Sequence, residues 1–236
     1  MSDIKDDYTL LSFKTLVLRL VKNSSIYGFF MLIIRFGGLF LTPVYWNFLS
    51  PSDYGILGVT NVLIGVLSPI IIIGINGSIE RFYYEWTEND RPRKLGTLWL
   101  MSVLVASSFV FIIEISSKYV FPVLFEKVSY IPYFRIALCT VFFESFAMIP
   151  FNIMRLTEKM KLFGTVSLVS FILRSATIIT MLFLIEQKVL GFLYGGLISS
   201  GLLSLFWICW ILTRIKFCAN VIQIKQELLY ALPSLP

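Results

Sequence analysis

The chain has 236 residues, of which 57% are hydrophobic and 14% are charged, and its mean hydropathy is +0.83. A soluble domain of this size does not need so much apolar surface, so the composition indicates an integral membrane protein. The net charge is +6 and the chain contains no histidine, which removes the usual general base and most zinc or haem sites.

The remaining composition also argues against catalysis. Cys139, Cys209 and Cys218 are isolated from one another and predict neither a disulfide nor a metal site. No Gly-rich phosphate loop follows a predicted strand, so the chain has no ATPase signature. We therefore expect a protein that is not an enzyme and that needs no cofactor.

Residues 1–23 precede the first long apolar run. Between Ile4 and Val21 apolar residues recur at helical spacing, with basic residues between them. This pattern predicts an interfacial amphipathic helix on the cytoplasmic side. A disordered tail is the alternative for residues 1–9. The segment is not a signal peptide, because it contains acids and lacks a small-residue cleavage site.

Residues 24–213 contain apolar runs long enough to cross a bilayer, which takes about 20 residues in a helix. The runs are continuous and lack the alternation of a membrane barrel. The fold class predicted is therefore all-α, a polytopic membrane bundle of six transmembrane helices. The runs are 25–49, 54–79, 97–117, 133–154, 162–185 and 189–212.

The basic residues fall mainly on one side of these runs. The N-terminal segment and the loops that share its side carry fourteen Lys and Arg residues, and the opposite loops carry three. By the positive-inside rule the N-terminus is cytoplasmic. The net charge thus reflects membrane topology, and we expect no nucleic-acid partner.

Three charged side chains lie deep inside the runs. Arg35, in "MLIIRFGGLFL", and Arg174 each lie about ten or more residues from a span end, on the order of 15 Å deep. Glu144 lies at similar depth, whereas Arg135 and Glu114 lie near span ends and can reach the interface. A charge at the bilayer centre costs a few kcal/mol or more. The deep residues should therefore face a protein interior or a watery cavity.

Polar residues share helical faces with these charges. Ser170 and Thr177 lie on the face of Arg174, and Asn61 lies on a polar face of the second run. The stripes predict a net cationic cavity between helices. The alternative is a buried ion pair of Glu144 with Arg35 or Arg174 that only fastens helices together. One glutamate cannot neutralise both arginines, so a surplus charge remains.

Other intramembrane features predict architecture. Small residues in the sixth run form two ridges that allow close helix packing: Gly195 with Ser199, and Gly196 with Ser200 and Ser204. Three prolines should kink or interrupt their spans: Pro43, Pro69 and Pro150.

Four stretches resemble one family of membrane proteins. They are "TPVYWNFLS", "FLSPSDYGILG", "IERFYYEW" and "MRLTEKMKLFG". The chain resembles the bacterial polysaccharide and O-antigen flippases of the multidrug/oligosaccharidyl-lipid/polysaccharide exporter superfamily. The resemblance implies two similar helix bundles around a cavity that opens to one side at a time.

The resemblance also implies a function and a location. Such a protein moves a polyprenyl-pyrophosphate-linked oligosaccharide, as used for O-antigen in lipopolysaccharide, capsule or exopolysaccharide, between leaflets of the bacterial cytoplasmic membrane. Its partners would be this lipid, the bilayer and polysaccharide polymerase machinery. By position Arg35 and Arg174 fit the role of meeting the pyrophosphate, with Glu144 as a partner or ion-coupling group. Arg81 and Arg155 fit the cytoplasmic entrance.

The end of the chain departs from this family pattern. Residues 214–236 read as a cytoplasmic loop followed by "LLYALPSLP", which resembles the start of a seventh helix. The chain is therefore expected to be truncated and to supply the N-terminal half of the transporter. Alternatives are a multidrug/cation antiporter or a peptidoglycan-precursor flippase of the same superfamily, and a non-transporting membrane scaffold or enzyme subunit.

Overall fold

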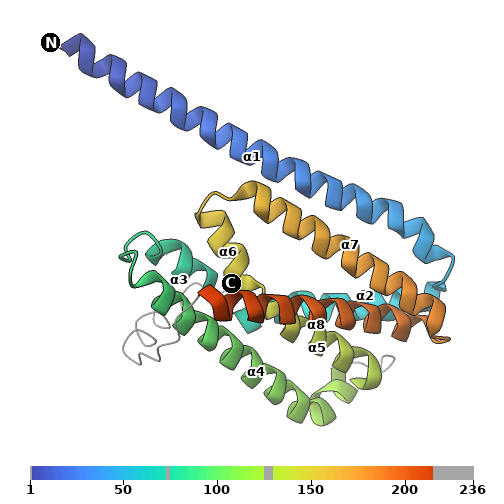
Figure 1. The fold of residues 1–236 in the computed structure, drawn as a ribbon. Coiled ribbons are helices and arrows are strands. Elements are labelled where there is room, and N and C mark those ends of the chain that lie inside the picture. Colours follow the sequence, from blue (N-terminus) through green and yellow to red (C-terminus); the bar gives the residue numbers. More distant parts are fainter. Residues whose placement is uncertain (1, 73–74, 125–129, 215–236) are drawn as a thin grey trace.

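The computed structural model describes residues 2–72, 75–124 and 130–214, and within these ranges it contains helices and no strand (Figure 1). The all-α prediction is confirmed for this part of the chain. The expected seventh helix lies outside the described residues. The elements are α1 (Ser2–Trp46), α2 (Pro51–Ile72), α3 (Ile75–Phe82), α4 (Arg91–Leu124), η1 (Tyr130–Phe134), α5 (Arg135–Ser145), α6 (Met148–Leu156), α7 (Met160–Leu184) and α8 (Lys188–Arg214).

Five helical stretches are long and apolar enough to cross a membrane, which makes this a multi-pass membrane protein. They are Phe13–Trp46, Arg91–Ser117, Tyr130–Leu156, Met160–Leu184 and Lys188–Thr213. The second expected span, 54–79, falls on α2 and α3, and residues 73–74 between them are not described. The expected count of six is therefore not confirmed, although α2 crosses the molecule behind α8 in Figure 1.

The N-terminal segment is continuous with the first span. The expected boundary after residue 23 is not marked by a break, because α1 runs unbroken from Ser2 to Trp46. No proline lies between residues 2 and 42, so no missing N–H interrupts the helix there. The first part of α1 projects beyond the other helices (Figure 1), and Phe13 and Leu18 are exposed.

The "SPSD" segment starts α2 by a reciprocal capping arrangement. The Ser50 N–H donates to Asp53 Oδ2 at 2.9 Å, and the Asp53 N–H donates to Ser50 Oγ at 3.3 Å. Pro51 occupies the first helical position, where a missing N–H costs nothing. Such a capping box contributes about 1 kcal/mol to helix stability. The polar residues of this family-like stretch thus have a structural role.

The fourth span is interrupted between α5 and α6, as its proline predicted. Pro150 has no N–H to donate to the Phe146 carbonyl one turn earlier. That carbonyl instead accepts the Trp99 indole N–H at 3.4 Å. The Ala147 N–H donates to the Glu144 carbonyl at 3.2 Å, a tighter turn than the α-helix. The interruption thus places Glu144 in the last turn of α5.

The closest helix pair is α7 with α8, which cross with their backbones nearly in contact. A Cβ added at Gly195 would lie 2.4 Å from Ile178 Cα, and one at Gly191 would lie 2.8 Å from the Met181 carbonyl oxygen. No larger residue fits between these backbones. The prediction that Gly195 permits close packing is confirmed, and α5 packs on the other side of α8.

Candidate functional site

A cavity of about 560 Å³ lies between α1, the α5–α6 pair, α7 and α8. Its walls are partly aromatic, with Phe143, Phe151, Phe171 and Trp207 among them. The polar residues that line it are Glu144, Arg155, Ser167, Ser170, Arg174, Ser199 and Ser200. Five helices therefore line one site inside an apolar bundle, and its polar residues come from α5, α6, α7 and α8.

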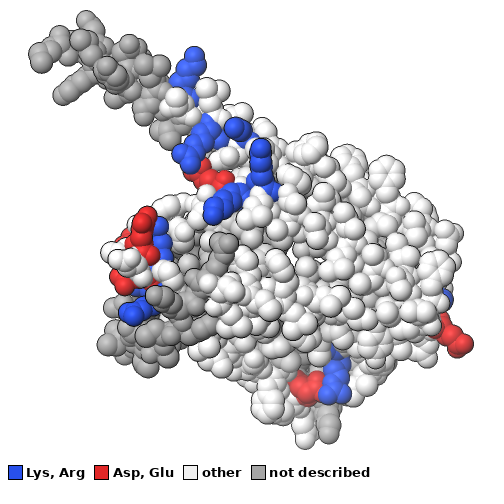
Figure 2. Space-filling model, viewed as in Figure 1, with Lys and Arg blue, Asp and Glu red and all other residues white. Residues whose placement is uncertain are grey.

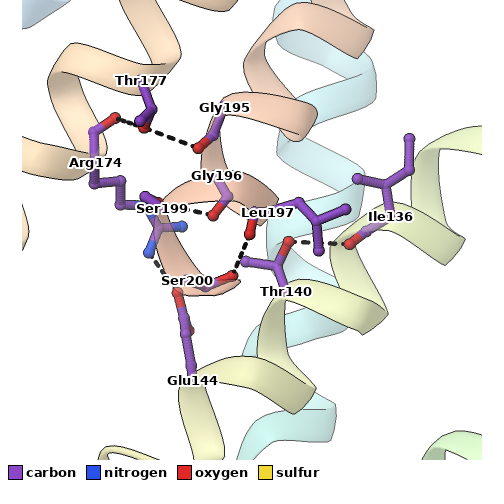
Figure 3. A network of polar contacts seen from close by, with 10 residues as sticks. All are labelled: Ile136, Thr140, Glu144, Arg174, Thr177, Gly195, Gly196, Leu197, Ser199 and Ser200. Atoms are coloured by element: carbon purple, nitrogen blue, oxygen red, sulfur yellow. Dashed lines mark hydrogen bonds and ion pairs between the residues drawn. The ribbon is translucent and has the colours of Figure 1, made fainter. Parts of the chain in front are cut away.

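Arg174 of α7 and Glu144 of α5 meet across this cavity (Figure 3). The guanidinium Nη1 lies 2.5 Å from Glu144 Oε1. The two side chains are 48% and 44% exposed, so the pair belongs to the cavity wall and is not sealed in the protein. The sequence alternative of an Arg174–Glu144 pair is thus realised, and the pair remains accessible to a ligand.

A second guanidinium faces the same cavity without a carboxylate partner. Arg155, in the last turn of α6, donates from Nη2 to Asn152 Oδ1. No carboxylate of the described residues forms an ion pair with it. The lining therefore holds two guanidinium groups against one carboxylate, a net charge of one positive.

The serine hydroxyls present acceptor oxygens to the cavity. Ser170 donates its hydroxyl proton to the Val166 carbonyl at 2.8 Å. Ser199 and Ser200 donate in the same way to their own helix (Figure 3). A hydroxyl whose proton is used still has lone pairs that accept hydrogen bonds. The wall thus offers donors at the arginines and acceptors at the serines.

Thr177 has a different place. Its hydroxyl oxygen lies 2.9 Å from the Gly195 carbonyl, to which it can donate across the α7–α8 contact (Figure 3). Thr177 is not among the cavity lining residues. Of the six predicted substrate-binding residues, the structure therefore brings Glu144, Ser170 and Arg174 to one cavity and places Thr177 beside it.

The other two predicted binding residues lie elsewhere. Arg35 is exposed on α1 and makes no hydrogen bond or ion pair with the described part of the chain. Its neighbour Ile34 lines the cavity, and one residue rotates a helix by about 100°. Asn61 is exposed on α2 and does not line the cavity.

The two residues predicted to lie at the cytoplasmic entrance are found in different places. Arg155 lies in the cavity itself, whereas Arg81 is exposed at the end of α3, with its guanidinium 5.5 Å from the Phe82 ring centroid. Sequence reasoning assigned Ser199 and Ser200 to packing and gave Trp207 no role. The sequence did contain a pattern that could have indicated their place in the cavity wall, because Ser200, Leu203 and Trp207 share one helical face.

Charged side chains are unevenly distributed over the surface. Figure 2 shows Lys, Arg, Asp and Glu at the edges of the visible face and an uncharged region across its middle. This distribution is what a membrane-spanning bundle requires. In the searched part of the chain, no three His, Cys, Asp or Glu side chains come together as a metal site.

Comparison with known proteins identifies the family. A family described as "Polysaccharide biosynthesis protein" matches residues 47–235, most of the chain. No curated protein and no solved structure matches. A match of this extent includes α2 to α8 and hence nearly all of the cavity. The chain belongs to the polysaccharide biosynthesis protein family.

Proposed function

We propose that this protein is a transporter that moves a polyprenyl-pyrophosphate-linked oligosaccharide from the inner to the outer leaflet of the bacterial cytoplasmic membrane. The chain supplies one bundle of a two-bundle fold, with its N-terminus in the cytoplasm. Family membership and the apolar helices support a polysaccharide-related membrane protein. The substrate and the direction of movement are part of the proposal.

The observation that carries the proposal is the excess of arginine over carboxylate in the cavity. Arg155 and Arg174 face Glu144 alone among the acidic residues of the lining. A guanidinium presents a planar fork of donors that matches phosphate oxygens. A pyrophosphate is the anion that most directly balances two such groups. The aromatic walls and serine oxygens suit the apolar faces and hydroxyl groups of sugars.

Glu144 has a regulatory part in this proposal. Its Oε1 lies 2.5 Å from Arg174 Nη1. A pyrophosphate oxygen that binds the same Nη1 displaces that carboxylate. Ligand binding and release of Glu144 are therefore linked, which provides a route to ion coupling once the carboxylate is free to bind a proton or cation.

Arg35 extends the proposal to the surface of α1. It is exposed on an apolar helix at a depth where lipid contact costs a few kcal/mol. We propose that the second bundle, and not lipid, covers this face, so that Arg35 and Asn61 meet the substrate between the bundles. Polysaccharide polymerase machinery is the proposed downstream partner.

Export of polysaccharide to the cell surface tests the proposal. Arg174→Gln and Arg155→Gln in the full-length protein are expected to reduce surface polysaccharide by an order of magnitude or more, because each removes a guanidinium that donates hydrogen bonds to the phosphate. Arg135→Gln is the matched control. Arg135 also pairs with a glutamate, Glu114 at 3.0 Å, but outside the cavity. Unchanged export in both cavity variants would refute the assigned roles.

A second candidate is a non-transporting scaffold or enzyme subunit, and the ion pair between α5 and α7 favours it. In a scaffold Arg174 and Glu144 only fasten two helices. The exchanged pair Arg174→Glu with Glu144→Arg would then retain function. In a transporter the exchange moves the positive charge across the cavity and export should stay low. A cation antiporter is less consistent with a lining in which arginines outnumber acids.

A further inference from the structure

A second pocket of about 250 Å³ lies at the end of the molecule where α4 and α7 begin. None of its lining residues lines the larger cavity. We call it the basic-end pocket, and its main lining residues are Arg91, Leu95, Met154, Lys159, Leu162 and Trp210. It is independent of the proposed transport function.

Two cations face the basic-end pocket. Arg91 donates from Nε to the Tyr83 carbonyl at 3.2 Å, which orients its guanidinium. The Lys159 ammonium group forms no ion pair within the described ranges, and only the backbone of this residue is hydrogen-bonded. Glu88 lies 4.0 Å from Arg91, but its side chain is 93% exposed, so water screens it strongly.

Tyr83 adds no negative charge to this pocket. Its ring lies 4.9 Å from the Arg91 guanidinium carbon. Burial raises the pKa of Tyr83, and the opposing effect of Arg91 is smaller. The phenol therefore stays neutral at physiological pH, and the cations outnumber the one solvated carboxylate.

Two long helices also begin at the pocket. α4 has 34 residues and starts at Arg91, and α7 has 25 residues and starts at Met160. Lys159, the residue before α7, provides no side-chain cap for the first-turn N–H groups. At the start of α4 the Arg91, Arg93 and Lys94 N–H groups already donate to the Thr87 and Asp90 carbonyls. The uncapped donors at the start of α7 and the positive end of its dipole add to the charge of Arg91 and Lys159. Together they make a site for an anion.

The opposite wall of the pocket is apolar. Leu95, Met154, Leu162 and Trp210 supply it from four different helices. A free inorganic anion gains nothing from such a wall, whereas a ligand with an attached hydrocarbon part does. The volume of about 250 Å³ equals roughly eight waters at about 30 Å³ each, enough for a phosphate and the glycerol that carries it.

We infer that the basic-end pocket binds the phosphate head group of an anionic phospholipid, with Arg91 and Lys159 on the phosphate and the apolar wall against the glycerol and the first acyl carbons. Both cations lie at the ends of membrane-spanning helices, which is the level of the head groups. The bound lipid joins the starts of α4 and α7.

Native mass spectrometry of the purified full chain in a non-ionic detergent tests the inference. The protein is titrated with phosphatidylglycerol and, separately, with zwitterionic phosphatidylcholine. We expect one phosphatidylglycerol to be retained preferentially. Lys159→Gln should weaken its retention about five-fold, since a cation near an anionic head group contributes about this much. Lys161→Gln is the matched control, because Lys161 is exposed two residues further along but does not line the pocket.

The outcomes separate a lipid site from its alternatives. Equal weakening by Lys159→Gln and Lys161→Gln would show diffuse surface attraction and overturn the inference. Displacement of the lipid by millimolar inorganic phosphate would show a site for the free anion and also overturn it. Because Arg91 supports the local fold, its variant is a secondary test, and Leu162→Ser probes the apolar wall instead. Leu162→Ser should weaken lipid retention without changing the melting temperature by more than about 2 °C.

Discussion

α1 and α7 each carry an arginine deep in an apolar run, and the two arginines have different surroundings. Arg174 lies between packed helices, pairs with Glu144 and lines a cavity. Arg35 lies on a helix that packs mainly on α7, and it faces outward. The depth of a charge within an apolar run can be read from the sequence. The partner of a deep charge depends on helix rotation and on which helices pack together.

The largest expected difference between α7 and α1 is the loss of stability when a methyl group is added at a glycine that lies against, or on, each helix. Gly195→Ala is expected to destabilise the protein by about 2–3 kcal/mol, because the new Cβ would lie 2.4 Å from Ile178 Cα. Gly38→Ala in α1 meets nothing within 4 Å and should leave stability unchanged or raise it by up to about 1 kcal/mol. Thermal unfolding in one detergent measures both variants. Equal melting temperatures would contradict the claim that the α7–α8 contact is tightly packed and the surface of α1 is not.

Replacing Arg174 and replacing Arg35 should also differ in their effect on stability, but by a smaller amount. Arg174→Gln is expected to cost about 1 kcal/mol, a value kept low because both partners are nearly half exposed. Arg35→Gln should change stability by less than about 0.5 kcal/mol. A double-mutant cycle with Glu144→Gln isolates the pair. A coupling energy of zero would show that the α5–α7 ion pair does not form in solution.

The smallest expected effect on stability concerns an ion pair at the start of α1. Arg19 Nε lies 2.6 Å from Glu158 Oε2, and Asn23 donates to the same oxygen at 3.0 Å. Arg19→Gln should cost about 0.5 kcal/mol locally and raise amide exchange in the first half of α1 about two-fold. Lys14→Gln is the control, because Lys14 is exposed and lacks an ion pair in the described residues. Equal exchange in the two variants would show that the contact does not hold α1.

Much of the fold could be predicted from the sequence. The runs 162–185 and 189–212 match α7 and α8 to within a few residues, because charged separators bound them on both sides. The predicted separate N-terminal helix is not confirmed, because α1 continues without a break from Ser2 to Trp46. An interfacial helix and a spanning helix share the same backbone, and no proline lies between them to mark a boundary.

The candidate site was predicted in part. The depth of Arg174 and Glu144 indicated a shared cavity, and the structure brings them together. Arg35 lies equally deep in its apolar run but does not line the cavity, whereas its neighbour Ile34 does, because one residue turns a helix by about 100°. Arg155 was assigned to an entrance, but α6, which follows the interruption before Pro150, carries it into the cavity. Orientations of this kind depend on tertiary packing, which spacing along one helix does not encode.

The central claim is that an anion and Glu144 compete for Arg174. The direct measurement is binding of a polyprenyl pyrophosphate to the purified full-length protein in nanodiscs, comparing Glu144→Gln with the matched Glu114→Gln. Glu114 also pairs with an arginine, but outside the cavity. We expect about five-fold tighter binding for Glu144→Gln, the effect of removing an ion pair of about 1 kcal/mol, and no change for Glu114→Gln. Unchanged or weaker binding in Glu144→Gln would contradict it.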